Sequence, residues 1–177
     1  ATESNAPRPR GEKGNKIMAS VLQKIVERGH YKFVDSVSSW QEAVKLSTES
    51  LVKTGYVDED YYKQIVSCIE EYGPYVVFDH YVAMPHSQED ASGVHKTSVG
   101  FMRVKEDVDF GVDEDGERKV ARLFFTLASC NPDEHTDNIA SLMGIFTNEP
   151  LLDALMEAET PEDILAAEEK YPCEEDF

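Results

Sequence analysis

The nine residues 120–128, Val-Ala-Arg-Leu-Phe-Phe-Thr-Leu-Ala, constrain the fold more than any other part of the chain. This segment is almost continuously apolar, which is typical of a central β-strand that is buried on both of its faces. Such a strand needs a layer of structure on each side of its sheet. Helical and strand-like segments alternate along the rest of the chain, so we expect those layers to be helices.

Apolar residues recur with helical spacing in six segments, at about residues 18–28, 39–54, 60–72 and 131–146 and after Asn148 and Thr160. Ser39 and Glu42 have the spacing of a capping box, and Asp58 or Asp60 can cap the next helix, which should bury Tyr62. Gly73-Pro74 closes that helix.

Strand-like patterns cover residues 31–37, two short segments within 75–84 that break near Asp79-His80, and residues 97–105, where apolar residues alternate. Residues 108–116 are acidic and rich in turn-forming residues, so we expect a loop there. The predicted fold class is α/β: a mixed, mostly short-stranded β-sheet flanked by helices on both faces.

Composition limits the partners and the compartment. The 177 residues carry a formal net charge of −18, which argues against nucleic acid as a partner because phosphate backbones favour basic surfaces. No apolar run is long enough to span a bilayer, so direct membrane insertion is not expected. Three widely spaced cysteines (Cys68, Cys130 and Cys173) do not form a disulfide framework, which favours a reducing cytoplasm.

The start of the chain differs from the rest in composition. It is rich in Pro, Gly, Asn and charged residues, a composition that does not bury enough apolar surface to fold. We expect residues 1–17 to be a disordered leader or the remnant of an expression tag. Residues 18–177 should form one domain.

The stretch from Tyr75 to Ser87 contains the best candidate for a reactive side chain. Its apolar, strand-like run ends at Met84-Pro85-His86. Pro85 has a fixed φ near −65° and biases Met84 away from the helical region, so extended backbone should continue to His86. An exposed imidazole at such a strand end can act as a base or as a nucleophile. The alternative is an ordinary exposed loop histidine.

His135 is the second candidate. It falls in the first turn of the helix that follows the 120–128 strand, after the N-cap Asn131 and Pro132 at the first helical position. Ligand sites in α/β sheets gather at such strand ends, and helix N-termini favour anions such as a phosphoryl group. The alternative for His135 is a solvated residue at a helix start.

Two further combinations are weaker candidates for metal sites. His80 and His95 could join His86 as ligands, but they lack a tight metal-binding spacing. Asp113-Glu114-Asp115-Gly116 lacks the complete calcium-loop pattern and is interpreted as a solvated turn.

Met84-Pro85-His86, preceded by Gly73-Pro74-Tyr75-Val76-Val77, resembles the IIA components of the phosphoenolpyruvate-dependent sugar phosphotransferase system (PTS). The similarity is to the mannitol/fructose-type IIA fold, also called EIIA type 2, and the ascorbate-specific branch looks closest. It also covers residues 39–44, 107–111 and 128–135, and therefore extends over residues 34–170 in the right order.

The resemblance implies a phosphotransferase that needs no metal and no organic cofactor. His86 matches the histidine that accepts a phosphoryl group from the histidine carrier protein HPr and passes it to a cysteine of a IIB component. His135 matches the second active-site histidine, which supports the phosphoryl group without being phosphorylated. A homodimer is compatible with this role, and the exact sugar stays open.

The chain departs from relatives at two places. Glu70-Glu71 stands where mannitol-type members carry an arginine, which favours the ascorbate branch, and Ser87-Gln88 follows His86 where many relatives have a small residue and then arginine. Losing that guanidinium removes a bidentate phosphate donor.

Two other functions are therefore left open. One is a regulatory module in which phosphorylation of His86 changes binding to a transcription factor or an enzyme. The other is a binding domain that has kept the fold without being phosphorylated.

Overall fold

The computed structural model describes residues 19–87 and 92–173. The predicted leader, residues 1–17, lies outside this part of the chain. The described helices are α1 (Val21–Arg28), α2 (Trp40–Lys53), α3 (Tyr61–Tyr72), α4 (Pro132–Phe146), α5 (Glu149–Met156) and α6 (Pro161–Lys170). The described strands are β2 (Tyr31–Val34), β3 (Val77–Phe78), β4 (Val82–Ala83), β5 (Ser98–Val112) and β6 (Arg118–Ala128). Among these helices, none has the length and apolar character needed to cross a bilayer.

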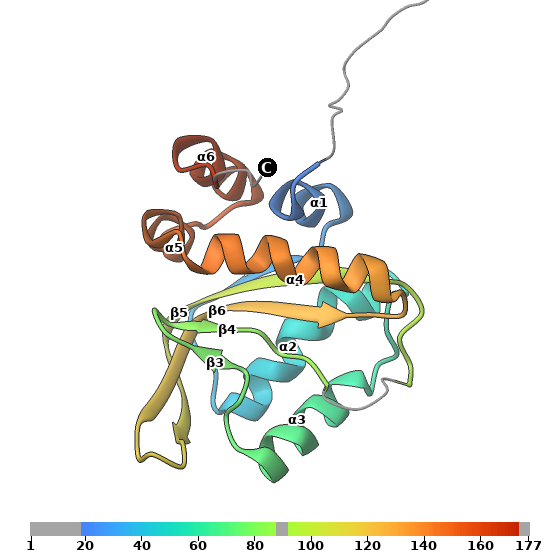
Figure 1. Cartoon of the computed structure of the whole chain (residues 1–177), viewed down its shortest axis with the longest axis vertical. Helices are drawn as coiled ribbons and strands as arrows, with labels where there is room; N and C mark the ends of the chain where they lie inside the picture. The colour runs from blue at the N-terminus through green and yellow to red at the C-terminus, as the bar shows by residue number, and fades with distance from the viewer. Residues whose placement is uncertain (1–18, 88–91, 174–177) are drawn as a thin grey trace, which may run out of the picture.

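The described strands form one mixed sheet in the order β2-β5-β6-β4-β3. β2 runs parallel to β5 and β4 runs parallel to β6, whereas the pairs β5–β6 and β3–β4 are antiparallel. Helices α2 and α3 lie on one face of the sheet, and α1, α4, α5 and α6 lie on the other (Figure 1). The predicted α/β class, with a mixed sheet between two helical layers, is confirmed.

β6 is the central strand, as its apolar sequence predicts. Leu123, Phe125 and Leu127 enter the core on the side of α1, α4, α5 and α6. Phe124 and Ala128 enter the opposite core, against α2 and α3. Burying one such large side chain contributes about 1.5–3 kcal/mol, so alternate residues of β6 anchor both helical layers to the sheet.

The strand predicted over residues 97–105 is longer than expected, and the loop predicted over residues 108–116 is shorter. β5 continues to Val112, and its residues 98–104 are all buried because helices cover both faces. The predicted acidic loop at 108–116 supplies the end of β5, and only residues 113–117 form the turn. Val108 and Phe110 are buried there, and the Phe110 ring stacks on Trp40 with centroids 5.6 Å apart. This contact to α2 stabilises a strand where charge alone suggests a loop.

The predicted capping box of α2 is only half formed. The Ser39 hydroxyl accepts a hydrogen bond from the Glu42 N–H at 3.1 Å, as expected for an N-cap. The Glu42 carboxylate, however, accepts from the backbone N–H and the hydroxyl of Ser38, at 2.6 and 2.9 Å, instead of from the Ser39 N–H. The neighbouring serine offers two donors to the same carboxylate oxygen, which accounts for the shift.

The start of α3 also differs from the prediction. Asp60 occupies the N-cap position but makes no side-chain capping bond in the described structure, and the Asp58 carboxylate bonds His95 instead. Tyr61 is buried with 2% of its surface exposed, whereas Tyr62 is only half-buried. Ile65 and Ile69 are buried at 0% and 3% exposure, so the buried face is centred on these two residues and includes Tyr61 in place of Tyr62.

His30 is a fully buried histidine that the sequence pattern does not reveal. Its Nδ1 lies 3.0 Å from the Ser98 hydroxyl, and its Nε2 lies 2.9 Å from the Thr54 hydroxyl. Burial lowers the pKa of His30 to about 4, and the positive charge of Arg28 acts in the same direction. The imidazole is therefore neutral at pH 7, with one ring nitrogen donating and the other accepting.

We expect the free energy of unfolding to fall as the pH is lowered from 6.5, the ordinary pKa of histidine, to about 4. In this window the unfolded chain binds a proton at His30 that the folded chain does not bind. The loss should reach about 3 kcal/mol at the acidic end. Urea unfolding at several pH values measures it. His30→Gln keeps hydrogen-bonding groups without titrating and should flatten this part of the curve; identical slopes for both proteins would contradict the prediction.

Candidate active site

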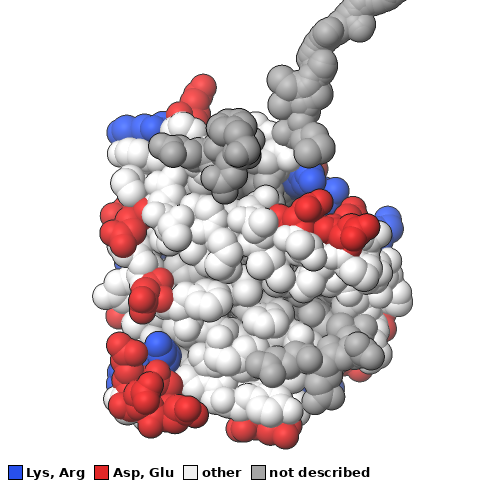
Figure 2. Space-filling model, in the orientation of Figure 1, with Lys and Arg blue, Asp and Glu red and all other residues white. Residues whose placement is uncertain are grey.

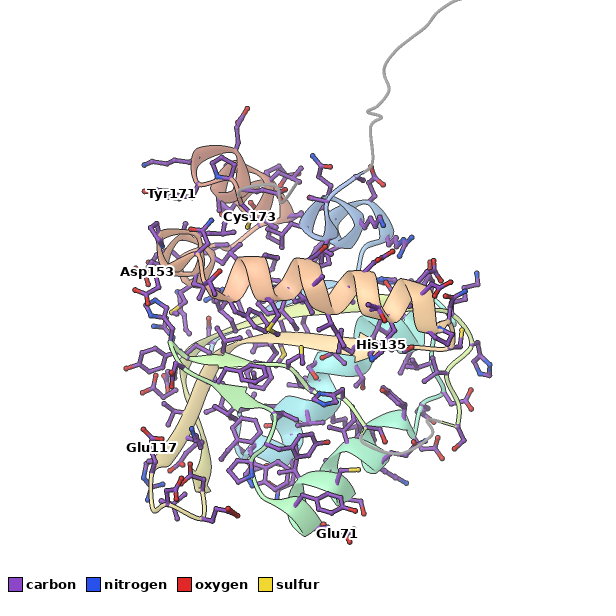
Figure 3. The ribbon with its side chains drawn as sticks, in the orientation of Figure 1. Glu71, Glu117, His135, Asp153, Tyr171 and Cys173 are labelled. Atoms are coloured by element: carbon purple, nitrogen blue, oxygen red, sulfur yellow. The ribbon has the colours of Figure 1, made fainter. Side chains whose placement is uncertain are left out.

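Both candidate histidines leave the sheet at the same edge. β4 is followed by the loop that carries His86, and β6 is followed by α4, which carries His135. Because β4 and β6 are parallel neighbours, their carboxyl ends lie side by side. Figure 3 shows His135 at the first turn of α4, beside the end of β6. The structure therefore brings together the two residues that the sequence analysis selected, while their chemical roles stay a prediction.

His86 is not the exposed loop residue that the sequence suggests. Its side chain is half-buried, and its ring meets the Tyr75 ring edge-on, with centroids 5.2 Å apart and an angle of 88° between the planes. Its Nδ1 lies 2.6 Å from the backbone carbonyl oxygen of Met84. A carbonyl can only accept, so a neutral His86 must carry its proton on Nδ1, which leaves the Nε2 lone pair unprotonated.

The main chain beside His86 is held at both ends of the loop. The Met84 N–H donates to the Val76 carbonyl at 2.8 Å, and the Leu127 N–H donates to the Pro85 carbonyl at 2.9 Å. The His86 carbonyl accepts from the Tyr75 hydroxyl at 2.5 Å. These bonds join the loop to β6 and to the segment before β3, so the imidazole stands on a stiff base.

The buried hydroxyl of Tyr61 holds the next part of the loop. It donates to the Leu127 carbonyl at 2.8 Å, and its oxygen accepts from the Ser87 N–H. Burial raises the pKa of Tyr61 to about 12, so the phenol stays protonated at neutral pH. The sequence analysis selected neither Tyr61 nor Tyr75 as a residue of the site. Their only sequence signal is a hydroxyl at positions where phenylalanine would pack equally well.

His135 is half-buried at the start of α4. The Asn131 side chain accepts from the Glu134 N–H at 3.0 Å, and the His135 N–H begins the helical ladder by donating to the Asn131 carbonyl at 2.9 Å. The predicted N-cap and the proline at the first turn are both confirmed. This cap places the imidazole near the positive end of the helix dipole, where an anion is favoured.

The surroundings favour the neutral form of His86. Burial lowers its pKa, and the charge of His135 acts in the same direction, while the hydrogen bond to the Met84 carbonyl opposes them. The effect of the His135 charge on His86 indicates that the two imidazoles lie within electrostatic range of each other. At neutral pH the site therefore presents an unprotonated Nε2 beside a second imidazole, which suits the nucleophilic acceptance of a group.

The other sequence candidates lie in separate contacts. His80 bonds the Asp153 carboxylate at 2.8 Å, and His95 bonds the Asp58 carboxylate at 2.7 Å. Within residues 19–87 and 92–173, no group of three or more His, Cys, Asp or Glu residues is placed to hold a metal ion. The Asp113 carboxylate accepts from the N–H groups of Asp115 and Glu117, both at 2.9 Å, and so closes the 113–117 turn.

Three comparisons identify what the chain is similar to. Residues 24–170 match the family described as "Phosphoenolpyruvate-dependent sugar phosphotransferase system, EIIA 2". The ascorbate-specific PTS system EIIA component of Escherichia coli K12 is 28% identical over 142 residues, which are 80% of this chain and 90% of that protein.

Solved structures agree with this match. The mannitol-specific cryptic phosphotransferase enzyme IIA of Escherichia coli shares the fold with a TM-score of 0.71 at 24% identity, over 83% of this chain and 97% of that one. The IIA protein in the Escherichia coli complex of mannitol enzyme IIA with phosphorylated enzyme IIB is 27% identical, with a TM-score of 0.65 over 78% and 92% of the two chains. The chain therefore belongs to the EIIA 2 family of the phosphoenolpyruvate-dependent sugar phosphotransferase system.

Proposed function

We propose that this chain is a cytoplasmic IIA phosphocarrier that accepts a phosphoryl group on His86 from phospho-HPr and passes it to the cysteine of a IIB component. The observation that carries the proposal is the bond between His86 Nδ1 and the Met84 carbonyl, 2.6 Å long. It directs the free Nε2 lone pair away from the backbone at the sheet edge where His135 also lies. Membership of the EIIA 2 family supports this assignment.

The two transfers need few groups. In the first, the N–P bond of the donor phosphohistidine breaks as a bond forms between phosphorus and His86 Nε2, while the Nδ1 proton stays on the ring and remains hydrogen-bonded to the Met84 carbonyl oxygen. In the second, the Nε2–P bond breaks as the thiolate sulfur of the IIB cysteine takes the phosphoryl group. Both are in-line displacements, which depend on alignment and on stabilising the phosphoryl charge more than on covalent chemistry.

His135 is the group that we assign to stabilising that charge. It acts electrostatically on His86 and stands in the first turn of α4, where the helix dipole favours an anion. The exposed acids Asp133 and Glu134 occupy the same turn and oppose a phosphoryl group there. We therefore assign the stabilisation of the negative phosphoryl charge to the imidazole of His135 and to the N-terminal end of α4.

The face that carries α4 suits a protein partner. Figure 2 shows mostly uncharged side chains in the middle of the face in view, with several groups of Asp and Glu around it and fewer Lys and Arg. Among the described residues, Met143 on α4 is an exposed apolar side chain, with 39% of its surface exposed. An apolar centre can be desolvated on docking, and an acidic margin steers a basic partner toward it.

The free cysteines and the predicted sugar branch complete the proposal. Cys68, Cys130 and Cys173 are all unpaired, which agrees with a reducing cytoplasm. The curated relatives at up to 28% identity are named ascorbate-specific. Glu70 and Glu71 are exposed at the end of α3, so this chain presents negative charge where mannitol-type members carry arginine. We therefore propose ascorbate uptake as the process that the carrier serves.

Incubation with phosphoenolpyruvate, enzyme I and HPr should add one acid-labile, base-stable phosphoryl group to the chain. His86→Ala should abolish the modification, because it removes the proposed acceptor nitrogen, and His135 at the same edge is assigned to support the phosphoryl group without accepting it. Intact-protein mass spectrometry measures the yield. His95→Ala is the matched control, since it removes an imidazole bonded to Asp58 and should leave the yield unchanged. Full phosphorylation of the folded His86→Ala protein would refute the assignment.

His135→Ala should slow both transfers without changing the modified residue. Losing one good hydrogen bond to a charged group costs about 1.5–3 kcal/mol, which corresponds to roughly a 10- to 100-fold slower rate. Rapid-quench measurements of acceptance from phospho-HPr and donation to IIB give the two rates. His80→Ala, which removes an imidazole bonded to Asp153, serves as the control. Unchanged rates in both directions would leave His135 as an ordinary residue at a helix start.

The phosphorylated chain should donate faster to an ascorbate-type IIB cysteine than to a mannitol-type or fructose-type one. A IIA protein does not touch the sugar, so its specificity is a difference in affinity for IIB surfaces, set by attractive and repulsive contacts around His86. Side-by-side transfer assays with purified IIB domains measure this difference. Equal rates, or a preference for the mannitol-type domain, would remove the ascorbate assignment while leaving the carrier function intact.

A further inference from the structure

Tyr75 makes two different contacts with the same residue. Its hydroxyl donates to the backbone carbonyl of His86 at 2.5 Å, and its ring meets the imidazole edge-on at a centroid distance of 5.2 Å. One side chain therefore restrains both the main chain and the side chain of the candidate nucleophile. A phenylalanine at this position could provide the ring contact but not the hydrogen bond.

Among the hydrogen bonds of the described part of the loop, the bond from Tyr75 is the one that restrains the His86 carbonyl. The Met84 N–H and the Pro85 carbonyl are bonded to neighbouring strand segments, and the Ser87 N–H is bonded to the Tyr61 hydroxyl. The carbonyl of His86 is held by a side chain instead. The peptide plane that contains this carbonyl is joined to the Cα of His86, and its orientation helps to set the direction of the Cα–Cβ bond. Holding the carbonyl therefore restricts the positions that the imidazole can reach.

Tyr75 is itself on a rigid base. Its N–H donates to the Gly73 carbonyl at 2.7 Å, and the Val77 N–H donates to the Pro74 carbonyl at 3.2 Å, so the chain turns tightly between α3 and β3. Burial raises the pKa of Tyr75 well above its ordinary value, with the neighbouring Cys68 acting in the same direction. The phenol is therefore always a donor at physiological pH, and its bond to the carbonyl does not titrate away.

We propose that Tyr75 is a positioning residue for phosphoryl transfer, and that its hydroxyl keeps the His86 imidazole in the orientation that bonds Nδ1 to Met84 and exposes Nε2. This inference rests on the proposed function of His86. It assigns Tyr75 no contact with the phosphoryl group, so the residue acts through His86 alone.

Tyr75→Phe removes the hydroxyl and keeps the ring, so the variant should fold. Without the carbonyl bond, the imidazole should turn away from Met84 in part of the molecules. The rate of acceptance at saturating phospho-HPr should fall about 3- to 10-fold, the effect of one neutral hydrogen bond. The apparent KM for phospho-HPr should not change, since Tyr75 is not assigned a contact with the donor.

A second measurement needs no phosphoryl donor. Nitrogen-15 NMR of the two ring nitrogens of His86 reports the tautomer in the unmodified protein. The wild-type chain should show a protonated Nδ1 and a bare Nε2, and Tyr75→Phe should shift this ratio toward a mixture of the two tautomers. Tyr62→Phe, which removes a phenol hydroxyl from a ring packed against Lys45, is the matched control and should alter neither the rate nor the tautomer.

The two measurements separate the possible failures. If the wild-type chain is not phosphorylated, the proposed function fails, and the NMR result alone decides whether Tyr75 orients His86. If the wild-type chain is phosphorylated, an unchanged rate or an unchanged tautomer ratio in Tyr75→Phe overturns the positioning role. A lower melting temperature with neither change would make Tyr75 a purely structural residue and overturns the proposal in the same way.

Discussion

The parallel pairing of β4 with β6 is the contact on which the candidate site depends. Only two residue pairs form it, Val82 with Leu123 and Ala83 with Phe124. Parallel strands end at the same edge of a sheet, so this pairing sends the loop after β4 and the helix after β6 to the same place. An antiparallel pairing would put His86 and His135 at opposite ends of the sheet. The short strand is extended by the bond from the Leu127 N–H to the Pro85 carbonyl, which continues the contact to the residue before His86.

The site combines a rigid support with a weakly charged environment. Sheet hydrogen bonds and two phenols hold the loop, while burial favours the neutral form of His86, which the proposed nucleophilic role requires. The first turn of α4 shows a compromise between stability and binding. Asp133 and Glu134 stabilise the helix by interacting with its positive end, yet they would repel the phosphoryl group of the proposed transfer at the same place. Both are exposed, so water and salt screen that repulsion more than they screen the contacts around the half-buried imidazoles.

Local signals in the sequence predicted much of this structure, and the failures have a common cause. The apolar run of β6, the Asn131 cap and the break near Asp79-His80 depend on neighbours in the chain, and all three appear where expected. The end of β5 was missed because its acidic residues resemble a loop. Contacts with distant segments stabilise the strand there: it pairs with β6, and Phe110 stacks on Trp40 of α2. His30 was missed for the same reason, since its hydroxyl partners Thr54 and Ser98 lie far away in sequence.

The sequence by itself determined the α/β class, the identity of the central strand and the choice of His86 and His135 as candidates, because periodicity, proline geometry and helix capping act over a few residues. Tertiary structure alone decided that His86 is half-buried rather than exposed and that its Nε2 is the free nitrogen. It also decided that Tyr61 and Tyr75 hold the loop, because their hydroxyls reach carbonyls of segments that the sequence pattern does not connect to them. Burial, tautomer and hydrogen-bond partner depend on which distant segments meet, and a linear pattern of residue types does not contain that information.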